Sequence, residues 1–146
     1  MKYILFIFLF SCTSEQPESV RNSAIEQTFV GKDLEFFNEF NQMRISRNLP
    51  TLKGNKQLTV GCKEHTEYMV ANDSLSHIGV GYRKIKSNAI SFSEVVAYGY
   101  VTQSSFLAGY MNSESHREAL TDENKTDIGI STIGLYQTVN LGEYEK

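Results

Sequence analysis

The spacing of apolar residues changes once along this chain, and that change limits the folds open to it. From Asp33 to about residue 112, apolar side chains recur at the three- and four-residue intervals of helices. Between residues 128 and 141 they alternate with small or polar residues, as in half-buried strands. A lone hairpin is marginal in water, so the sequence predicts one α+β domain in which the helices cover a sheet.

The predicted elements follow from this spacing and from the residues that end each segment. Asp33 is a suitable N-cap for the first helix, and Pro50 excludes helical backbone just beyond its end. Gly134 marks the bend of the predicted hairpin, which needs a further strand to pair with. The predicted helical segments are residues 33–47, 55–71, 102–112 and 115–120.

Two further segments have weaker signals. Residues 79–86 fit a short helix or an extended piece, and the sequence does not decide between them. Ser91 stands three residues before Glu94 and ahead of an apolar run, which is the spacing of a capping box. That spacing predicts a short helical turn beginning near Ser91.

The N-terminus carries an export signal. Residues 4–10 are all apolar, follow Lys2 and precede Ser11 and Cys12, a run that is too short for a membrane-spanning helix. Residues 1–11 are therefore predicted to be a lipoprotein-type signal peptide, because residues 9–12 resemble a bacterial lipobox with Cys12 as the lipidated residue. Simple secretion and an uncleaved N-terminal anchor are the alternatives. Each places the protein outside the cytoplasm, as a membrane-anchored lipoprotein or as a secreted or periplasmic protein.

Composition bounds the rest of the chain. Residues 12–31 are mostly polar and are predicted to be a flexible tether, which leaves residues 32–146 as the folded domain. The 14 basic and 17 acidic residues are dispersed, so no basic patch indicates a nucleic-acid partner. Beyond Cys12 only Cys62 remains, at helical spacing among apolar residues, so we expect a small buried side chain and no disulfide framework.

Three polar residues from separate segments are the candidates for a site: His77, Glu94 and His116. Two imidazoles and a carboxylate can hold zinc in an open catalytic arrangement. Their spacing alone is weak evidence, because no H-E-x-x-H pair places two ligands on one helix face. The remaining histidine, His65, shares a helical face with Cys62 and is predicted to be buried and satisfied by a backbone group.

Nucleophilic catalysis has little support in the sequence. Ser113 and Ser115 flank His116, but no G-x-S-x-G turn frames either serine. The thiol of Cys62 lies in an apolar helix face, where burial would raise its pKa and leave it unreactive.

Five segments, taken in order, resemble the bacterial branch of the CAP superfamily. This is the SCP domain of cysteine-rich secretory proteins, antigen 5 and pathogenesis-related proteins, whose bacterial members carry N-x-x-R, S-H-T-G, G-E-N-I-A-Y-G, W-M-N-S-P-G-H-R and I-G-V-G. Five ordered motifs are far more specific than any one of them. The corresponding segments are residues 40–52, 76–79, 93–99, 110–117 and 127–130.

The resemblance implies a three-layer α-β-α sandwich with a central antiparallel sheet and a cleft on one face. In the family that cleft is lined by histidines and glutamates, and in some members it holds a divalent metal such as zinc. Matching motif by motif, the resemblance makes His77, Glu94 and His116 the cleft residues and the candidate metal ligands. Ser113 stands where relatives have a second glutamate. Glu114 is close enough in sequence to replace that acid, or is a solvated loop residue.

Two functions from different classes follow. The first is an exported binding module, tethered by lipid on Cys12, whose cleft takes an unidentified ligand, lipid or protein. The alternative is a zinc-dependent hydrolase in which His77 and His116 hold the metal and Glu94 is a ligand or activates water. The sequence favours the binding module, because it offers no credible nucleophile or acid/base pair. In a third possibility, the polar trio only ties loops together.

Overall fold

The structure, a computed structural model, describes residues 28–145. The predicted signal peptide, Cys12 and residues 12–27 of the predicted tether lie outside the described residues. Within residues 28–145, no helix combines the length and the apolar content needed to cross a bilayer.

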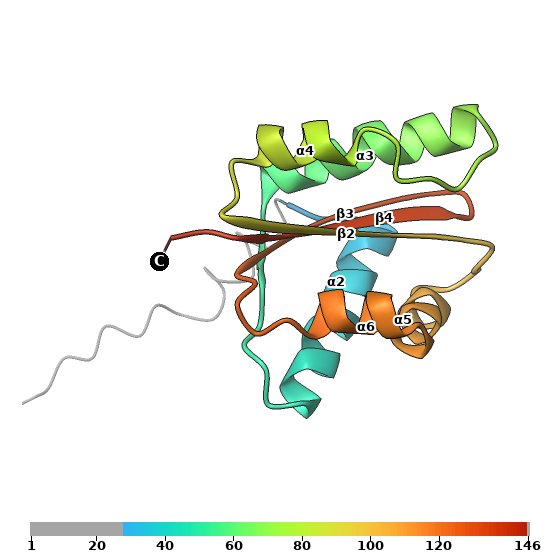
Figure 1. The fold of residues 1–146 in the computed structure, drawn as a ribbon. Helices are drawn as coiled ribbons and strands as arrows, with labels where there is room; N and C mark the ends of the chain where they lie inside the picture. The colour runs from blue at the N-terminus through green and yellow to red at the C-terminus, as the bar shows by residue number, and fades with distance from the viewer. Residues whose placement is uncertain (1–27, 146) are drawn as a thin grey trace, which may run out of the picture.

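A four-stranded sheet forms the middle layer, in the order β1-β3-β4-β2 (Figure 1). Strands β3 and β4 form the predicted hairpin around Gly134, whose φ of +61° suits glycine. β4 also pairs antiparallel with β2 along its length, and the two residues of β1 pair parallel with β3. The strands are β1 (Lys53–Gly54), β2 (Ser91–Tyr98), β3 (Asp127–Ile133) and β4 (Tyr136–Glu143).

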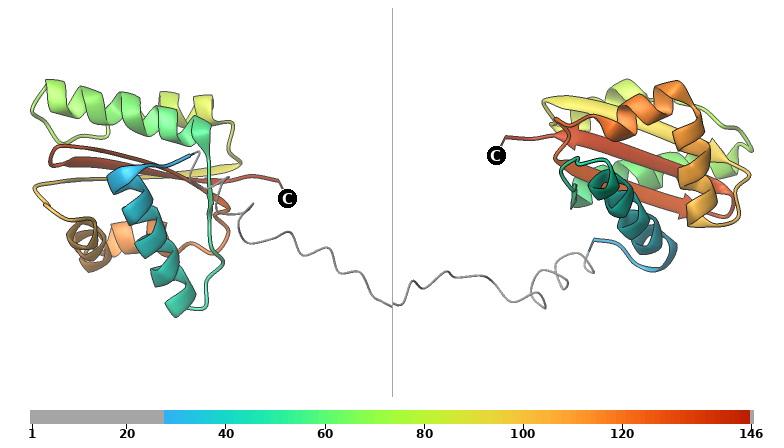
Figure 2. Two further views of the ribbon diagram at one scale, coloured as in Figure 1. Left: turned by 180° about the vertical axis from the view of Figure 1, so that it is seen from behind. Right: turned by 90° about the horizontal axis from the view of Figure 1, so that it is seen from below.

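Helices cover both faces of this sheet, which confirms the predicted α-β-α sandwich. α3 and α4 lie on one face, and α2, α5 and α6 lie on the other (Figures 1 and 2). The short segment that fitted helix or extended chain equally is the helix α4. The helices are α2 (Gly31–Ser46), α3 (Lys56–Ala71), α4 (Val80–Ser87), α5 (Gln103–Asn112) and α6 (Glu114–Thr121).

The predicted helical turn at Ser91 is wrong, because residues 91–98 are the strand β2. Every residue of this strand is paired with β4, from Ser91 opposite Glu143 to Tyr98 opposite Tyr136. Eight cross-strand pairs outweigh what a single side-chain cap offers a short helix. The capping box lies instead at the start of α5, where Thr102 and Ser105 exchange hydrogen bonds with each other's backbone N–H groups.

The main core lies between the sheet and the layer of α2, α5 and α6. α2 contributes the buried side chains of Phe36, Phe37 and Phe40. Phe29, inside the predicted tether, is also buried and its ring lies 5.0 Å from that of Phe37. Packing against the core therefore begins before residue 32, the predicted start of the domain. Ile45, next to the end of the same helix, is 52% exposed and lies outside this core.

The residue of α2 buried near its end is Arg44, which belongs to the N-x-x-R motif. Its guanidinium donates to three backbone carbonyls, those of Pro50 (2.6 Å), Leu120 (2.8 Å) and Asp122 (3.1 Å). Asn41 of the same motif exchanges two hydrogen bonds with the backbone of Leu52. The motif therefore joins α2 to the chain before β1 and to the end of α6.

On the opposite face, α3 lies against β3 and β4. Gly129 of β3 permits this contact, since a Cβ atom at this position would stand 2.4 Å from the backbone of Leu58 and Thr59. Asn55 caps the helix by accepting hydrogen bonds from the N–H groups of Gln57 and Leu58. This close packing fixes the buried face of α3, including His65, over the sheet.

Candidate functional site

Glu94 lies on β2, and its side chain is directed to the α3 and α4 side of the sheet. Its neighbour Val95 enters the main core on the other side, because successive residues of a strand face opposite ways. Only 1% of the Glu94 side chain is exposed. A carboxylate this deeply buried needs a charged partner or several hydrogen-bond donors.

The charged partner is Arg83 of α4. Its Nε donates to Glu94 Oε2 at 2.6 Å and its Nη2 donates to Oε1 at 2.7 Å, so the pair is bidentate. Nη1 donates to the carbonyl of Ile78 at 2.8 Å, which also fixes the chain before α4. Arg83 is 7% exposed, so this ion pair is almost entirely shielded from solvent.

His77 lies in the loop between α3 and α4 and completes the group around Glu94. Its Nδ1 is 3.1 Å from Glu94 Oε1 and carries the hydrogen, because a carboxylate oxygen only accepts. In the neutral ring, Nε2 is then an acceptor. The side chain is 49% exposed, so His77 is the member of the group that a molecule in solution can reach.

His65 of α3 is buried, and its Nε2 donates to the carbonyl of Ser76 at 2.6 Å. This confirms the predicted backbone partner. The same nitrogen lies 3.9 Å from Glu94 Oε1, so His65 also borders the group. Burial lowers the pKa of His65, although the bond to Ser76 opposes that shift. Near neutral pH the ring is therefore uncharged.

The other predicted cleft residues lie at the junction of α5 and α6. His116 packs edge-on against the ring of Tyr110, with centroids 5.4 Å apart. Burial lowers its pKa, and the nearby charge of His77 lowers it further. Ser113 precedes α6 and its Oγ is 3.5 Å from that of Ser115, while Glu114 is exposed. Within residues 28–145 none of the three hydrogen-bonds to Glu94. The structure thus joins His77 to Glu94 by a hydrogen bond, and His116 lies near enough to His77 for the charge of that residue to act on it.

The arrangement does not fit a zinc site built on His77, Glu94 and His116. Arg83 already donates to both carboxylate oxygens of Glu94 and neutralises its charge. Among residues 28–145, no group of three or more His, Cys, Asp or Glu side chains is placed to hold a metal ion. No chemical step is therefore derived through a metal.

A hollow of about 250 Å³ adjoins this group, between α3 and the start of α4. Glu64, His65 and Arg83 provide its polar lining, and the side chains of Tyr68, Ile78 and Tyr82 provide apolar surface. His77 is not one of the lining residues, but it directly precedes Ile78 along the chain, and its half-exposed side chain bonds to the same carboxylate as Arg83. We call this hollow the α3–α4 groove; mostly apolar walls with a few fixed polar groups are typical of small-ligand sites.

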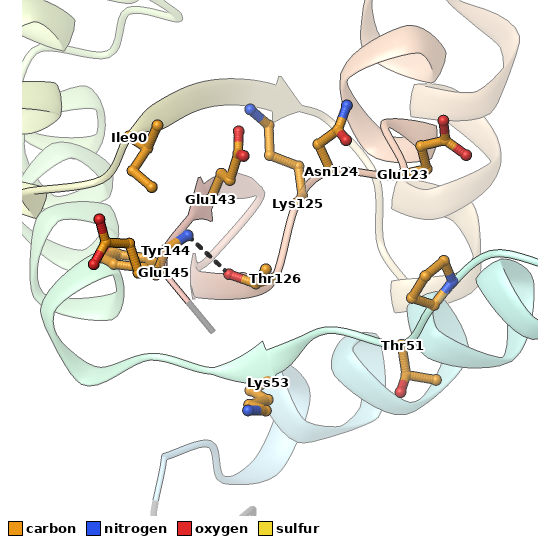
Figure 3. Close-up of a pocket in the computed structure, with 11 residues that line it drawn as sticks. Thr51, Lys53, Ile90, Glu123, Asn124, Lys125, Thr126, Glu143, Tyr144 and Glu145 are labelled. Carbon is orange, nitrogen blue, oxygen red and sulfur yellow. Dashed lines mark hydrogen bonds between the residues drawn. The ribbon is translucent and has the colours of Figure 1, made fainter.

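A larger cavity, of about 640 Å³, lies where β1 and β3 begin and β4 ends (Figure 3). Its buried ammonium, on Lys125, is bonded to Ser91 and lies 3.4 Å from a carboxylate oxygen of Asp122. Charges of both signs surround the cavity, including Lys53 and Glu143. It contains none of the predicted site residues, and its lysine is already paired. The smaller α3–α4 groove is therefore the better candidate site.

Comparison with known proteins agrees with this architecture. The family model that matches is that of the cysteine-rich secretory protein family, CAP, over residues 37–140. The chain belongs to the CAP superfamily. The match spans α3, the His77 loop, β2 and α6, so the Glu94 group lies inside the CAP domain.

Three bacterial proteins illustrate how far the similarity extends. An extracellular SCP-domain protein from Bacillus anthracis is 25% identical with a TM-score of 0.75, over 82% of this chain and 43% of that one. An outer surface protein from Borrelia burgdorferi is 22% identical with a TM-score of 0.70, over 76% of this chain and 91% of that one. The membrane protein YlbC from Bacillus subtilis is 24% identical over 86% of this chain and 38% of its own length. The chain thus spans less than half of two of these relatives.

The sequence motifs did not identify Arg83 as part of the site. It lies in the segment that fitted helix or extended chain equally, and no motif of the resemblance includes it. The available signal was indirect: an acidic residue in a strand buried on both faces requires a nearby cation. Arg83 is the first basic residue that follows His77.

Proposed function

We propose that this CAP protein is exported, is held at a membrane by lipid on Cys12, and binds a ligand through the α3–α4 groove beside His77 without catalysing a reaction. The observation that carries the proposal is the bidentate bond from Arg83 to Glu94. A carboxylate whose two oxygens both accept from a guanidinium is a poor general base, because its charge is already neutralised. The pair is instead suited to fixing α4 and His77 in place.

The groove indicates the class of ligand. Tyr68, Ile78 and Tyr82 offer aromatic and aliphatic surface for a small ring or chain. His77 is held by Glu94 so that its Nε2 accepts a hydrogen bond from a molecule in solution. A small apolar group that carries one N–H or O–H donor has the matching chemistry. Since His77 and Arg83 are already fixed by Glu94, binding requires little rearrangement of these side chains.

Export is supported by the signal-like N-terminus and by the relatives. One relative is described as extracellular, one as an outer surface protein and one as a membrane protein. The lipid anchor rests on Cys12 and the residues before it. Mass spectrometry of the protein from a bacterial membrane fraction tests it: a diacylglyceryl mass on Cys12 is expected, and an unmodified cysteine would remove the anchor from the proposal.

Ligand-observed NMR with a library of small aromatic amides, alcohols and phenols tests the groove. Fragments should bind the wild type and lose about tenfold in affinity in His77→Ala, the loss of about one hydrogen bond. The control is Asn124→Ala in the larger cavity, which should bind as the wild type does. Equal binding by His77→Ala and the wild type would show that the groove is not the site.

The zinc-dependent alternative has its own test. Calorimetric titration should give the same weak zinc binding for the wild type and for the His77→Ala/His116→Ala variant. Peptidase and esterase substrates should not be turned over, with or without zinc. Zinc-dependent turnover that disappears in Glu94→Ala would replace the binding module with a hydrolase.

A further inference from the structure

In the helix α4, polar side chains face the protein interior and apolar side chains face solvent, which is the reverse of the usual arrangement. Arg83 and Ser87 point inward and are 7% and 3% exposed. Tyr82 and Ile85 are 66% and 80% exposed, and Ile78, four residues before Tyr82, is also exposed. Tyr82 and Ile85 are three residues apart on α4 and share a face, while Ile78 lies in the turn before the helix and lines the same groove as Tyr82. We call Ile78, Tyr82 and Ile85 the α4 stripe.

The inward polar residues account for only half of this arrangement. Arg83 is needed inside to neutralise Glu94, and the hydroxyl of Ser87 accepts a hydrogen bond from the backbone N–H of Ala89 just beyond the helix. Neither requirement calls for isoleucine and tyrosine on the opposite side. No other element of residues 28–145 covers the outer side of α4 (Figure 1). A contiguous apolar stripe that remains in solvent indicates an interaction surface.

Lysines accompany the stripe. Lys84 and Lys86 are exposed on the same helix, and the ammonium of Lys86 lies 5.8 Å from the centre of the Tyr82 ring. Residues 74–93 contain no aspartate or glutamate, although the whole chain carries a net charge of −3. Glu64 of α3 is the acid that faces this surface, and it pairs with Lys86 at 2.9 Å. Lys84 has no ion-pair partner within residues 28–145.

We propose that the α4 stripe docks on an anionic lipid surface, with Ile78, Tyr82 and Ile85 among the headgroups and Lys84 and Lys86 against lipid phosphates. A short helix that combines aliphatic and aromatic side chains with flanking lysines has the chemistry of a helix lying in the membrane interface. The proposal rests on the proposed function only for the membrane anchor, which keeps α4 within reach of the headgroups.

The size of the surface favours lipid over a second copy of the chain. α4 has eight residues and is about 12 Å long. Three side chains bury on the order of a few hundred Å², whereas a stable protein interface takes about 800 Å² from each partner. A membrane contact needs less area, because the anchor supplies most of the affinity and the lysines add attraction to anionic lipid.

The absence of tryptophan from this chain allows a direct test. Two single-tryptophan variants of the full chain are compared, Ile85→Trp on the stripe and Val101→Trp in the loop between β2 and α5, where Val101 is 75% exposed. Both have the same N-terminus, so the comparison reports which face meets the lipid. With vesicles of phosphatidylcholine and phosphatidylglycerol, Ile85→Trp emission should shift to shorter wavelength and brominated lipid should quench it. Val101→Trp emission should not change.

Lysine reversal and lipid composition complete the test. Lys84→Glu/Lys86→Glu in the Ile85→Trp background should raise the lipid concentration at half-maximal shift by roughly tenfold or more. Vesicles of phosphatidylcholine alone should give little shift. Equal shifts in the two tryptophan variants, or none in Ile85→Trp, would overturn the proposal. A shift that follows protein concentration without vesicles would assign the stripe to a second copy. The fragment assay at His77 does not depend on Ile85, so either proposal can fail while the other stands.

Discussion

The two faces of the sheet differ in what fills them. Between the sheet and α2, α5 and α6 lies a continuous apolar core that includes four phenylalanines of the helices, Phe36, Phe37, Phe40 and Phe106. Between the sheet and α3 and α4, the apolar cluster of Met69, Val96 and Tyr136 is small, and the buried pair Arg83–Glu94 lies beside it. A buried ion pair adds little stability compared with apolar packing of the same volume. The first face therefore supplies most of the stability of the CAP domain, and the second holds the polar groups around Glu94 in position.

The largest loss of stability is expected on the aromatic face. Phe36 is fully buried, with the rings of Phe40 and Tyr110 at 6.2 Å. Phe36→Ala should lower the free energy of unfolding by about 4 kcal/mol, through lost apolar burial and the cavity that remains. Urea unfolding followed by circular dichroism measures the change. Ile45→Ala, on the exposed side of the same helix, should change stability by less than about 0.5 kcal/mol. Similar losses in both variants would mean that α2 is not packed as described.

A somewhat smaller loss of stability is expected when Arg83 is replaced on the polar face, and removal of Glu94 as well should reverse most of it. Arg83→Met leaves the Glu94 carboxylate buried without its cation and should cost about 3 kcal/mol. Removing the acid as well, in Arg83→Met/Glu94→Leu, should recover most of that stability, because no charge then remains buried. The same urea experiment measures both variants. A double variant as unstable as the single one would show that the pair contributes by packing and not by charge.

The next largest effect is expected from lowering the pH, which should reduce the free energy of unfolding. Burial lowers the folded-state pKa of His65 and of His116 below the ordinary value near 6.5. The unfolded chain then takes up protons first, so stability is complete above about pH 6.5 and falls as the pH drops through that value toward the lowered one. Urea unfolding between about pH 7.5 and about pH 5.5 should show this loss, with a shallower slope in His65→Gln. The carboxyl of Asp33, whose pKa burial raises, acts in the opposite sense but equally in both proteins. Equal slopes would remove His65 from the explanation.

The smallest loss of stability is expected for substitution of His77, which should have the largest effect on fragment binding. His77 is half-exposed and makes a single hydrogen bond, to Glu94. His77→Ala should change the free energy of unfolding by less than about 1 kcal/mol, since it removes one hydrogen bond from a half-exposed side chain and leaves Glu94 paired with Arg83. Fragment binding in the groove should nevertheless fall in the same variant. A loss of several kcal/mol would make His77 a structural tie between loops, the third possibility raised by the sequence.

The sequence predicted those parts of the fold that depend on local spacing or on a series of motifs in a fixed order. Helical spacing predicted α2, α3 and α5 to within a few residues, and five motifs in order predicted the sandwich. β2 was missed because the capping-box spacing of Ser91 and Glu94 is local, whereas the strand depends on pairing with residues 136–143. Arg83 was missed for the same physical reason, since its partner Glu94 lies 11 residues away on another element.

The candidate site was predictable as a set of residue types but not as a set of contacts. The motifs brought His77 and Glu94 into one place, and the structure joins that pair by a hydrogen bond. They did not show that an arginine pairs with Glu94, nor that the ring of His116 packs on that of Tyr110. Both depend on side-chain directions that the motif spacing leaves open.

The hydrogen bonds of Arg44 have a consequence for the order in which the domain folds. The guanidinium on α2 donates to the carbonyl of Leu120, 76 residues later in the chain. β1 likewise finds its partner only at Asp127 and Ile128 of β3. A chain emerging from a ribosome or a translocation channel therefore holds the aromatic face of α2 uncovered until its last third has appeared. Folding of this domain is predominantly a late, non-local event, and the unfinished chain is the form most exposed to aggregation and proteolysis.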